Sequence, residues 1–250
     1  MDSPRRLLYR AYWKAEAAIV PGLTSSQYGY YKKLRSLIPD KTWLDLGCGH
    51  QVFADWMTNE QAEIIASCRT AYGIDLDWTG LKAHPAISNK VFGDLAHLPF
   101  EAECVDVVSA NMVAEHLADP EPVLREIHRV LKPNGVFVFH TPNRRGWPTR
   151  MAARIPDGLK KKLIWLLERR REEDVFPTHY RMNSSSAIAK LAAETGFTVE
   201  DITAVSTSAA TAMLGPVALV ELLYIRYLQR PQGAEFRSNL VAALQKRSIR

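Results

Sequence analysis

The 250-residue sequence has little cysteine and no long hydrophobic run that is free of charges. Its three cysteines, Cys48, Cys68 and Cys104, are odd in number and share no C-x-x-C spacing, so they fit neither a disulfide framework nor a zinc site. The longest apolar stretch, residues 214–228, includes two charged residues and falls short of the roughly 20 residues that a membrane-spanning helix needs. We therefore expect a cytoplasmic protein that does not cross a membrane.

We also expect no secretory signal, because five charged residues interrupt the N-terminal region: Arg5, Arg6, Arg10, Lys14 and Glu16. At 250 residues the chain is long enough to bury one full core. We predict an N-terminal helical cap, residues 1–41, and a main domain, residues 42–250, that carries a basic helical insertion at about residues 144–183.

The net charge of +5 is concentrated in one segment. Residues 144–171 hold ten Lys or Arg against two acids, a local balance of +8, so the rest of the chain sums to −3. Within this segment, residues 159–171 combine Leu and Trp with basic side chains. Such a helix either lies at an anionic membrane surface, here the inner face of the membrane, or binds an anionic substrate. The alternative is a lid helix with a solvated basic face.

A short apolar run that stops at two glycines organises the chain. Residues 43–46 precede Gly47 and Gly49, and a helix-compatible segment, residues 53–67, follows. Glycine permits positive φ and close approach of a ligand, and the N-terminus of a helix supplies free N–H groups. The pattern indicates a nucleotide-like ligand lying against bare backbone, although many such turns contain glycine for steric reasons alone. A dinucleotide fingerprint starting at Gly47 is excluded, because Val52 stands where its third glycine belongs.

Acidic residues end the next two predicted strands. Residues 71–75 finish in Asp75, which could accept hydrogen bonds from ribose hydroxyls or cap a helix at residues 77–81. Residues 90–94 finish in Asp94, with apolar side chains following it, a pairing suited to the amine and faces of an adenine. Carboxyl ends of parallel strands lie at one edge of an open α/β sheet, which is the expected binding side.

Further elements extend the alternation of strands and helices. We predict N-terminal helices within residues 4–38 broken at Pro21 and Gly22, and from residue 42 to 141 a mostly parallel, doubly wound sheet. Asp119 and Pro120 are a good helix start, and Ser184 is another helix cap. The later expected elements are strands at 105–109, 136–139 and 197–205, helices at 119–131 and 184–195, and helical structure from about 215 to near the end of the chain.

The ordered motifs of residues 42–143 resemble the class I S-adenosylmethionine-dependent methyltransferases, and are most similar to the small-molecule branch that includes quinone-biosynthesis-type enzymes. A bacterial subgroup also resembles this chain in the stretch at residues 174–181. The motifs are Leu44-Asp45-Leu46-Gly47-Cys48-Gly49, Gly73-Ile74-Asp75, Gly93-Asp94-Leu95 with Leu98-Pro99-Phe100, Glu115-His116-Leu117, and Val130-Leu131-Lys132-Pro133-Asn134-Gly135.

The resemblance implies a Rossmann-like, seven-stranded sheet whose last strand is antiparallel. It also implies that Asp45, Gly47 and Gly49 hold the methionine end of the donor, that Asp75 holds the ribose, and that Asp94 with Leu95 holds the adenine. Gln51 departs from the family, which often has a third glycine there. The expected donor-binding residues are Asp45, Gly47, Cys48, Gly49, Asp75, Leu76, Asp94, Leu95 and Asn111.

Transfer to a hydroxyl acceptor requires a base, and histidine is the usual one. His116, His140 and His179 lie in segments that we expect to face the pocket, yet each has a structural alternative: fixing a loop, filling the strand, or bonding to backbone. Glu115 is a weaker base candidate, and Arg181 could pair with an anionic acceptor. No cluster has the spacing of a metal site.

We therefore predict a methyltransferase acting by in-line displacement on a small-molecule, lipid-linked or saccharide acceptor. There are two alternatives. One is an RNA methyltransferase whose basic residues 144–171 bind the phosphates of the RNA, and the other is a non-catalytic donor-binding protein. Against nucleic acid, residues 109–112 read Ser-Ala-Asn-Met where amino-methylating relatives have an Asn-Pro-Pro-Tyr type of loop, and no Pro-Cys pair is present.

Overall fold

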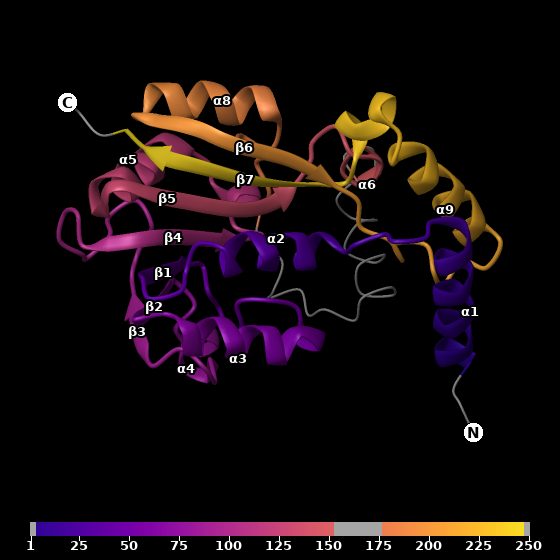
Figure 1. Cartoon of the computed structure of the whole chain (residues 1–250), viewed down its shortest axis with the longest axis horizontal. Coiled ribbons are helices and arrows are strands. Elements are labelled where there is room, and N and C mark those ends of the chain that lie inside the picture. Colours follow the sequence, from indigo (N-terminus) through magenta and orange to yellow (C-terminus); the bar gives the residue numbers. More distant parts are fainter. Residues whose placement is uncertain (1–3, 153–176, 248–250) are drawn as a thin grey trace. The chain divides into compact units, whose positions relative to one another are not determined.

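Strands and helices alternate as the apolar periodicity predicts, in a computed structural model that describes residues 4–152 and 177–247 (Figure 1). The strands are β1 (Thr42–Leu46), β2 (Thr70–Asp75), β3 (Asn89–Phe92), β4 (Val105–Asn111), β5 (Leu131–Pro142), β6 (Phe197–Val205) and β7 (Asn239–Lys246). The helices are α1 (Pro4–Ile19), α2 (Ser26–Arg35), α3 (Thr58–Ser67), α4 (Trp78–Ala83), α5 (Pro120–Val130), α6 (Trp147–Ala152), α8 (Ser185–Glu194) and α9 (Val217–Leu228), with 3-10 turns η1 (Asp55–Met57), η2 (Ala114–His116) and η4 (Pro231–Phe236).

The seven strands form one sheet in the order β3-β2-β1-β4-β5-β7-β6. The pairs β1–β2, β2–β3, β1–β4 and β4–β5 are parallel, whereas the arrowheads of β6 and β7 point in opposite directions (Figure 1). This confirms the doubly wound, mostly parallel sheet. The chain leaves β1 toward one edge and returns to β4 on the other side, so a topological switch point lies between the carboxyl ends of β1 and β4, where open α/β sheets bind ligands.

The C-terminal region differs from the expectation. Helical structure ends at Leu228 in α9, and the chain then forms η4 and the strand β7. The prediction of a helix to near the end was therefore wrong. β7 is buried along almost its whole length and pairs between β5 and β6. Its uninterrupted apolar run is typical of a strand buried on both faces, which periodicity alone cannot distinguish from a buried helix.

The predicted helix caps are confirmed. The Asp119 side chain accepts a hydrogen bond from the Glu121 amide, with Pro120 in the first turn of α5. The Ser184 hydroxyl accepts one from the Ala187 amide at the start of α8. Side-chain oxygens at these positions satisfy amides that have no partner within the helix, which explains why both helices begin where the sequence indicates.

The two faces of the central sheet differ in polarity. Leu46, Ala110 and Phe137 point to the face packed by Leu124 and Ile127 of α5. Successive strand residues point to opposite faces, so a second, more polar set points the other way. On that face the His140 ring stacks on Tyr30 of α2, with ring centroids 5.8 Å apart. The side chains that share this second face are Trp43, Asp45, Ser109, Asn111 and His140.

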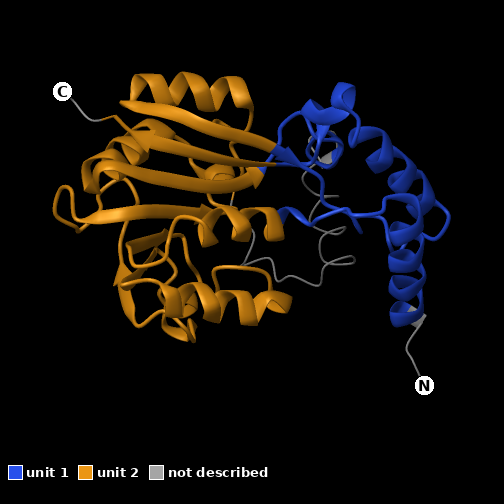
Figure 2. Cartoon of the chain, viewed as in Figure 1, with its two compact units in different colours: residues 1–26, 142–176, 204–239 blue, residues 27–141, 177–203, 240–250 orange. Residues whose placement is uncertain are grey.

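The chain divides into two compact units (Figure 2). Unit 1 comprises residues 1–26, 142–176 and 204–239, and unit 2 comprises residues 27–141, 177–203 and 240–250. Unit 1 has its own apolar cluster between α1 and α9, which includes Tyr12, Leu222 and Ile225. Within residues 4–152 and 177–247, no helix is long and apolar enough to cross a membrane.

Candidate functional site

The glycine turn after β1 is held by the neighbouring strand β2. The amides of Gly47 and Cys48 both donate to the carbonyl of Ile74, at 2.8 and 3.3 Å. The Gly49 amide donates to Oδ2 of Asp75 at 2.7 Å. All three amides therefore have partners within the chain, and what the turn offers a ligand is open backbone rather than free N–H groups.

Gly47 and Gly49 are glycines for different reasons. Both have positive φ, +60° and +47°, which favours glycine. A Cβ at Gly47 would lie 2.5 Å from Cγ2 of Val113, so the close approach of that side chain excludes one. A Cβ at Gly49 would meet only Oδ2 of Asp75, at 4.0 Å. The space beside the Asp75 carboxylate is therefore open at Gly49.

Asp75 ends β2 and bonds to two amides. Its Oδ1 accepts from the Asp77 amide at 2.7 Å, while Oδ2 accepts from Gly49. The helix cap itself is Asp77, whose side chain accepts from the Thr79 amide. Asp75 thus fixes the local loop, and each of its oxygens has a further lone pair for a ligand. The following side chain, Leu76, is 61% exposed beside it.

Asp45 lies in β1 and is almost completely buried. The Ser109 hydroxyl donates to its Oδ1 and itself accepts from Nε1 of Trp43 at 2.7 Å. Burial is the main cause that raises the pKa of Asp45 to about 7. The Ser109 hydrogen bond lowers this pKa, and the neighbouring Asp75 charge raises it further. The carboxyl group therefore joins β1 to β4 through the Ser109 hydroxyl.

Cys48 is buried with its thiol against Gly73, where a Cβ would lie only 2.6 Å from Sγ. Burial raises the pKa of the thiol, so it stays protonated. The side chain therefore fills space between β1 and β2, and only the Cys48 backbone faces the turn. Glycine at position 73 is required by this thiol, a relation that sequence reasoning missed.

Asp94 follows β3 and closes its own loop. Its Oδ1 accepts from the Ala96 amide at 3.0 Å, and Oδ2 lies 3.3 Å from Nδ1 of His97. The Ala96 hydrogen bond is the main cause that holds the pKa of Asp94 below its usual value. The Asp94 side chain is 54% exposed, while Leu95 is buried.

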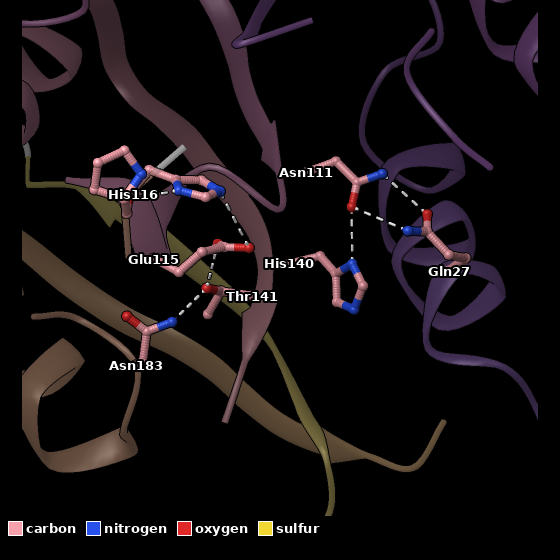
Figure 3. A network of polar contacts seen from close by, with 8 residues as sticks. Gln27, Asn111, Glu115, His116, His140, Thr141 and Asn183 are labelled. Carbon is pink, nitrogen blue, oxygen red and sulfur yellow. Dashed lines mark hydrogen bonds and ion pairs between the residues drawn. The ribbon is translucent and has the colours of Figure 1, made fainter. Parts of the chain in front are cut away.

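Asn111, at the end of β4, is the centre of a polar network on the α2 face (Figure 3). Its amide pairs with that of Gln27, with Nδ2 donating to Oε1 at 2.9 Å and Oδ1 accepting from Nε2 at 3.3 Å. Nδ2 also donates to the Val52 carbonyl, and Oδ1 lies 2.8 Å from Nδ1 of His140. Gln27 was not foreseen, because no local signal marks a partner 84 residues away.

His140 is fully enclosed in β5, between Asn111 and the Tyr30 ring. Burial lowers its pKa to about 4, so it is neutral near pH 7. Since Nδ1 pairs with an amide oxygen, the neutral ring carries its proton on Nδ1.

Glu115 and His116 form a second network, on the α5 face (Figure 3). Nε2 of His116 lies 4.0 Å from Oε1 of Glu115, and Nδ1 of His116 lies 2.9 Å from the Pro177 carbonyl. Oε2 of Glu115 accepts from the Thr141 hydroxyl at 3.0 Å, and Asn183 donates in turn to that hydroxyl at 2.6 Å. Burial raises the pKa of Glu115, whereas the His116 charge and the Thr141 hydrogen bond oppose the rise.

The structure does not bring the three candidate histidines together. His140 and Thr141 are consecutive in β5 and point to opposite faces, so His140 is separated from the network that Thr141 joins. His179 donates its backbone amide to the Glu115 carbonyl at 2.7 Å, while its side chain is exposed. Arg181 is exposed as well. Only His116 combines a fixed ring orientation with a carboxylate neighbour and partial exposure, its side chain being 33% exposed.

The basic segment of residues 159–171, expected to meet an anionic membrane, lies outside the described residues. Among the residues that are described, no group of three or more His, Cys, Asp or Glu could hold a metal ion.

All the expected donor-binding residues and all three histidines belong to unit 2.

Comparison with known proteins agrees with this geometry. A family model for a methyltransferase domain matches residues 28–202. A probable S-adenosylmethionine-dependent methyltransferase from Mycolicibacterium smegmatis is 28% identical over 205 residues, which cover 78% of this chain and 69% of that protein. A ubiquinone biosynthesis O-methyltransferase from Citrobacter koseri is 29% identical over 152 residues, 56% of this chain, and the aligned region spans only 60% of that enzyme.

Among solved structures, an S-adenosylmethionine-dependent methyltransferase from Mesorhizobium loti matches with a TM-score of 0.56 and 17% identity, over 89% of this chain and 98% of that chain. At this identity the likeness supports the fold alone. The family model, by contrast, covers most of the chain, including the glycine turn, the acidic strand ends and the Glu115–His116 segment. This chain therefore belongs to the class I S-adenosylmethionine-dependent methyltransferases.

Proposed function

We propose that this methyltransferase methylates a hydroxyl group on a small-molecule, lipid-linked or saccharide acceptor, with His116 as the general base. The observation that carries the proposal is the Glu115–His116 pair beside the switch point of the sheet. The relative from Citrobacter koseri is named an O-methyltransferase, which supports a hydroxyl acceptor. When bound, S-adenosylmethionine supplies an electrophilic methyl group.

The chain offers features that fit the ribose and adenine of this donor. The open position at Gly49 leaves room beside the Asp75 carboxylate, whose remaining lone pairs suit two ribose hydroxyls. The exposed Leu76 side chain offers an apolar surface for one face of an adenine. Asp94 keeps its exposed carboxylate for the exocyclic amine, with Leu95 beside it.

The remaining candidates act by positioning. Gly47 lets the turn pack against Val113, and Cys48 fills the space beside Gly73. Asp45 joins β1 to β4 through its bond with Ser109, and Asn111 uses both amide atoms within the chain. These residues shape the site, so their replacement would change donor affinity through the turn rather than through a lost contact.

His116 is oriented for proton abstraction. Nδ1–H donates to the Pro177 carbonyl, so Nε2 is the basic nitrogen of the neutral ring. The acceptor O–H proton moves to Nε2, and the positive charge that forms on the ring is stabilised by the Glu115 carboxylate 4.0 Å away. Thr141 and Asn183 hold that carboxylate in place.

Two measurements test the proposal. Calorimetric titration with S-adenosylmethionine should give saturable binding that Asp75→Asn weakens at least tenfold, since an amide has one accepting oxygen where a carboxylate has two. Methyl-labelled donor incubated with the enzyme and separated lipid, saccharide and RNA extracts should label an alkali-stable ether in the lipid or saccharide fraction. Label found only in RNA, or donor binding without transfer to any fraction, would overturn the assignment of a small-molecule, lipid-linked or saccharide acceptor.

A further inference from the structure

The outer face of α9 is apolar although it is open to solvent. Its inner residues, among them Leu222 and Ile225, pack in the cluster that joins α9 to α1 within unit 1. The side chains opposite them are between 37% and 66% exposed, and no charged residue interrupts the middle of their stripe. We call this set the α9 stripe: Val217 at 50%, Leu219 at 49%, Val220 at 66%, Leu223 at 59%, Tyr224 at 37% and Tyr227 at 45% exposed.

A helix that is apolar all round is normally covered on every side. Contiguous exposed apolar patches mark binding surfaces, whereas single exposed apolar residues need no explanation. Residues 217, 220, 224 and 227 recur at spacings of three and four, so they share one side of the helix. Tyr224 and Tyr227 stack with ring centroids 6.3 Å apart. Tyrosine suits a boundary between apolar and aqueous phases, because its ring is apolar and its hydroxyl polar.

The charge of unit 1 indicates what covers the stripe. The described residues of this unit contain ten Lys or Arg against three acids, Glu16, Glu221 and Glu235. Glu221 is buried and bonded to the amides of Ala210 and Thr211, so it does not face solvent. The described residues of unit 2, in contrast, contain 18 acids against 14 Lys or Arg and so carry a net negative charge. The stripe therefore belongs to the cationic part of the chain.

We propose that the α9 stripe docks on an anionic lipid surface, with Arg226 and Arg230 at its polar margin. Both arginines are exposed, and long basic side chains keep their charged ends in the headgroup region while their stems lie along apolar surface. Anionic lipids attract cations near the surface, so apolar burial and charge act together. A second copy of the chain is disfavoured, because an isologous contact would bring the cationic units against each other.

The length of α9 agrees with lying on a membrane rather than crossing it. Its 12 residues span about 18 Å, short of the roughly 30 Å of a hydrocarbon core. One face is already occupied by the α1 cluster, so only the stripe is available to the lipid. The surface does not depend on the proposed acceptor or on His116, and it is distinct from the basic segment of residues 159–171.

Vesicle flotation of the full chain tests the proposal without donor or acceptor. Phosphatidylcholine vesicles with about one third phosphatidylglycerol should retain the protein at low salt and release most of it at 0.5 M salt, because screening weakens the cationic attraction. Pure phosphatidylcholine vesicles should retain at least tenfold less. The double substitution Val220→Ser and Leu223→Ser should reduce retention on the anionic vesicles more than tenfold. The single substitution Arg230→Gln should reduce the salt dependence of retention.

Val199→Ser is the matched control, since Val199 is a valine 39% exposed on β6 in unit 2. It should leave retention unchanged. The proposal is overturned if the anionic vesicles do not retain the protein, or if the V220S/L223S variant binds as well as the parent. It is also overturned if light scattering shows a dimer that this double variant dissociates, because the stripe would then be a self-association surface. Because no methyl transfer is measured, a failure of vesicle binding does not contradict the proposed activity. A failure of the activity test, in turn, does not contradict the docking of the α9 stripe on lipid.

Discussion

At the scale of single residues, Asp45 and His140 are two buried ionisable groups whose neutral forms are favoured by the fold. Burial raises the pKa of Asp45 to about 7 and lowers that of His140 to about 4. The two shifts have opposite consequences for stability. Asp45 binds its proton more tightly in the folded state, so its contribution to the free energy of unfolding is present at low pH and is lost as pH rises to about 7. His140 contributes above pH 6.5 and loses that contribution as pH falls toward 4.

Asp45→Asn should therefore change the pH dependence of stability. Asparagine keeps an oxygen for the Ser109 hydroxyl and has no charge to bury. We expect the free energy of unfolding of the variant, relative to the parent, to rise by about 2–3 kcal/mol between pH 5 and pH 8. Urea unfolding at both pH values measures this difference. A difference that is the same at both values would show that Asp45 does not titrate in this range.

The Glu115–His116 pair carries a catalytic prediction. His116→Gln should lower kcat about 100-fold, because the base is lost, and Glu115→Gln should lower it about tenfold with little change in KM, because the ring charge loses its partner. His179→Gln is the control, since the His179 side chain is exposed and only its backbone contacts Glu115. Steady-state kinetics with the labelled acceptor decide the matter. An equal loss of kcat in His179→Gln would transfer the base role to that residue.

At the scale of elements, the glycine turn depends on how closely β1 and the segment after β4 approach each other. Gly47 contacts the Val113 side chain, and the amides of the turn are held by the end of β2. The turn is therefore a packed junction of three elements. Its shape comes from contacts between distant segments as much as from the backbone freedom of glycine.

Gly47→Ala should be more destabilising than Gly22→Ala, although both glycines have positive φ. At Gly22 no atom lies within 4 Å of a new Cβ, so only the backbone strain of about 1 kcal/mol is expected. At Gly47 the contact with Val113 adds a further 1–3 kcal/mol or so. Thermal and urea unfolding compare the two variants. Adding Val113→Ala should reduce the destabilisation caused by Gly47→Ala and leave that of Gly22→Ala unchanged. An equal loss of stability in the two single variants would mean that the contact with Val113 is easily relieved.

At the scale of the whole molecule, the residues of the two proposals lie in two discontinuous units. The expected donor-binding residues and His116 lie in unit 2, whereas the α9 stripe lies in unit 1. The chain passes between the units several times, so each contains segments distant in sequence. The acidic unit 2 and the basic unit 1 explain why the overall charge of +5 says little about any single surface.

Leu222→Ala should destabilise the protein and leave donor affinity unchanged. Leu222 is fully buried in the α1–α9 cluster, and its truncation leaves a cavity that costs about 2–5 kcal/mol. Leu223→Ala, at a position that is 59% exposed, is the neighbouring control and should cost little. Calorimetry gives both the unfolding temperature and the donor affinity of each folded variant. Loss of donor affinity in folded Leu222→Ala would show that unit 1 takes part in donor binding.

The sequence by itself determined the features that depend on neighbouring residues. Apolar periodicity located the strands through residue 141, and Asp119 and Ser184 marked helix starts, because capping is chemistry within one turn. The glycine turn and the acidic strand ends likewise depend on short spacings, which is why the family and the donor could be predicted.

Only the tertiary structure decided the features that depend on residues far apart in the chain. It formed the buried strand β7 after α9, where helical structure was predicted to continue, paired Gln27 with Asn111, and separated His140 from the Glu115–His116 pair. Strand alternation puts consecutive residues on opposite faces, and the partner on each face comes from another element. No local pattern records that partner, so its identity follows from packing alone.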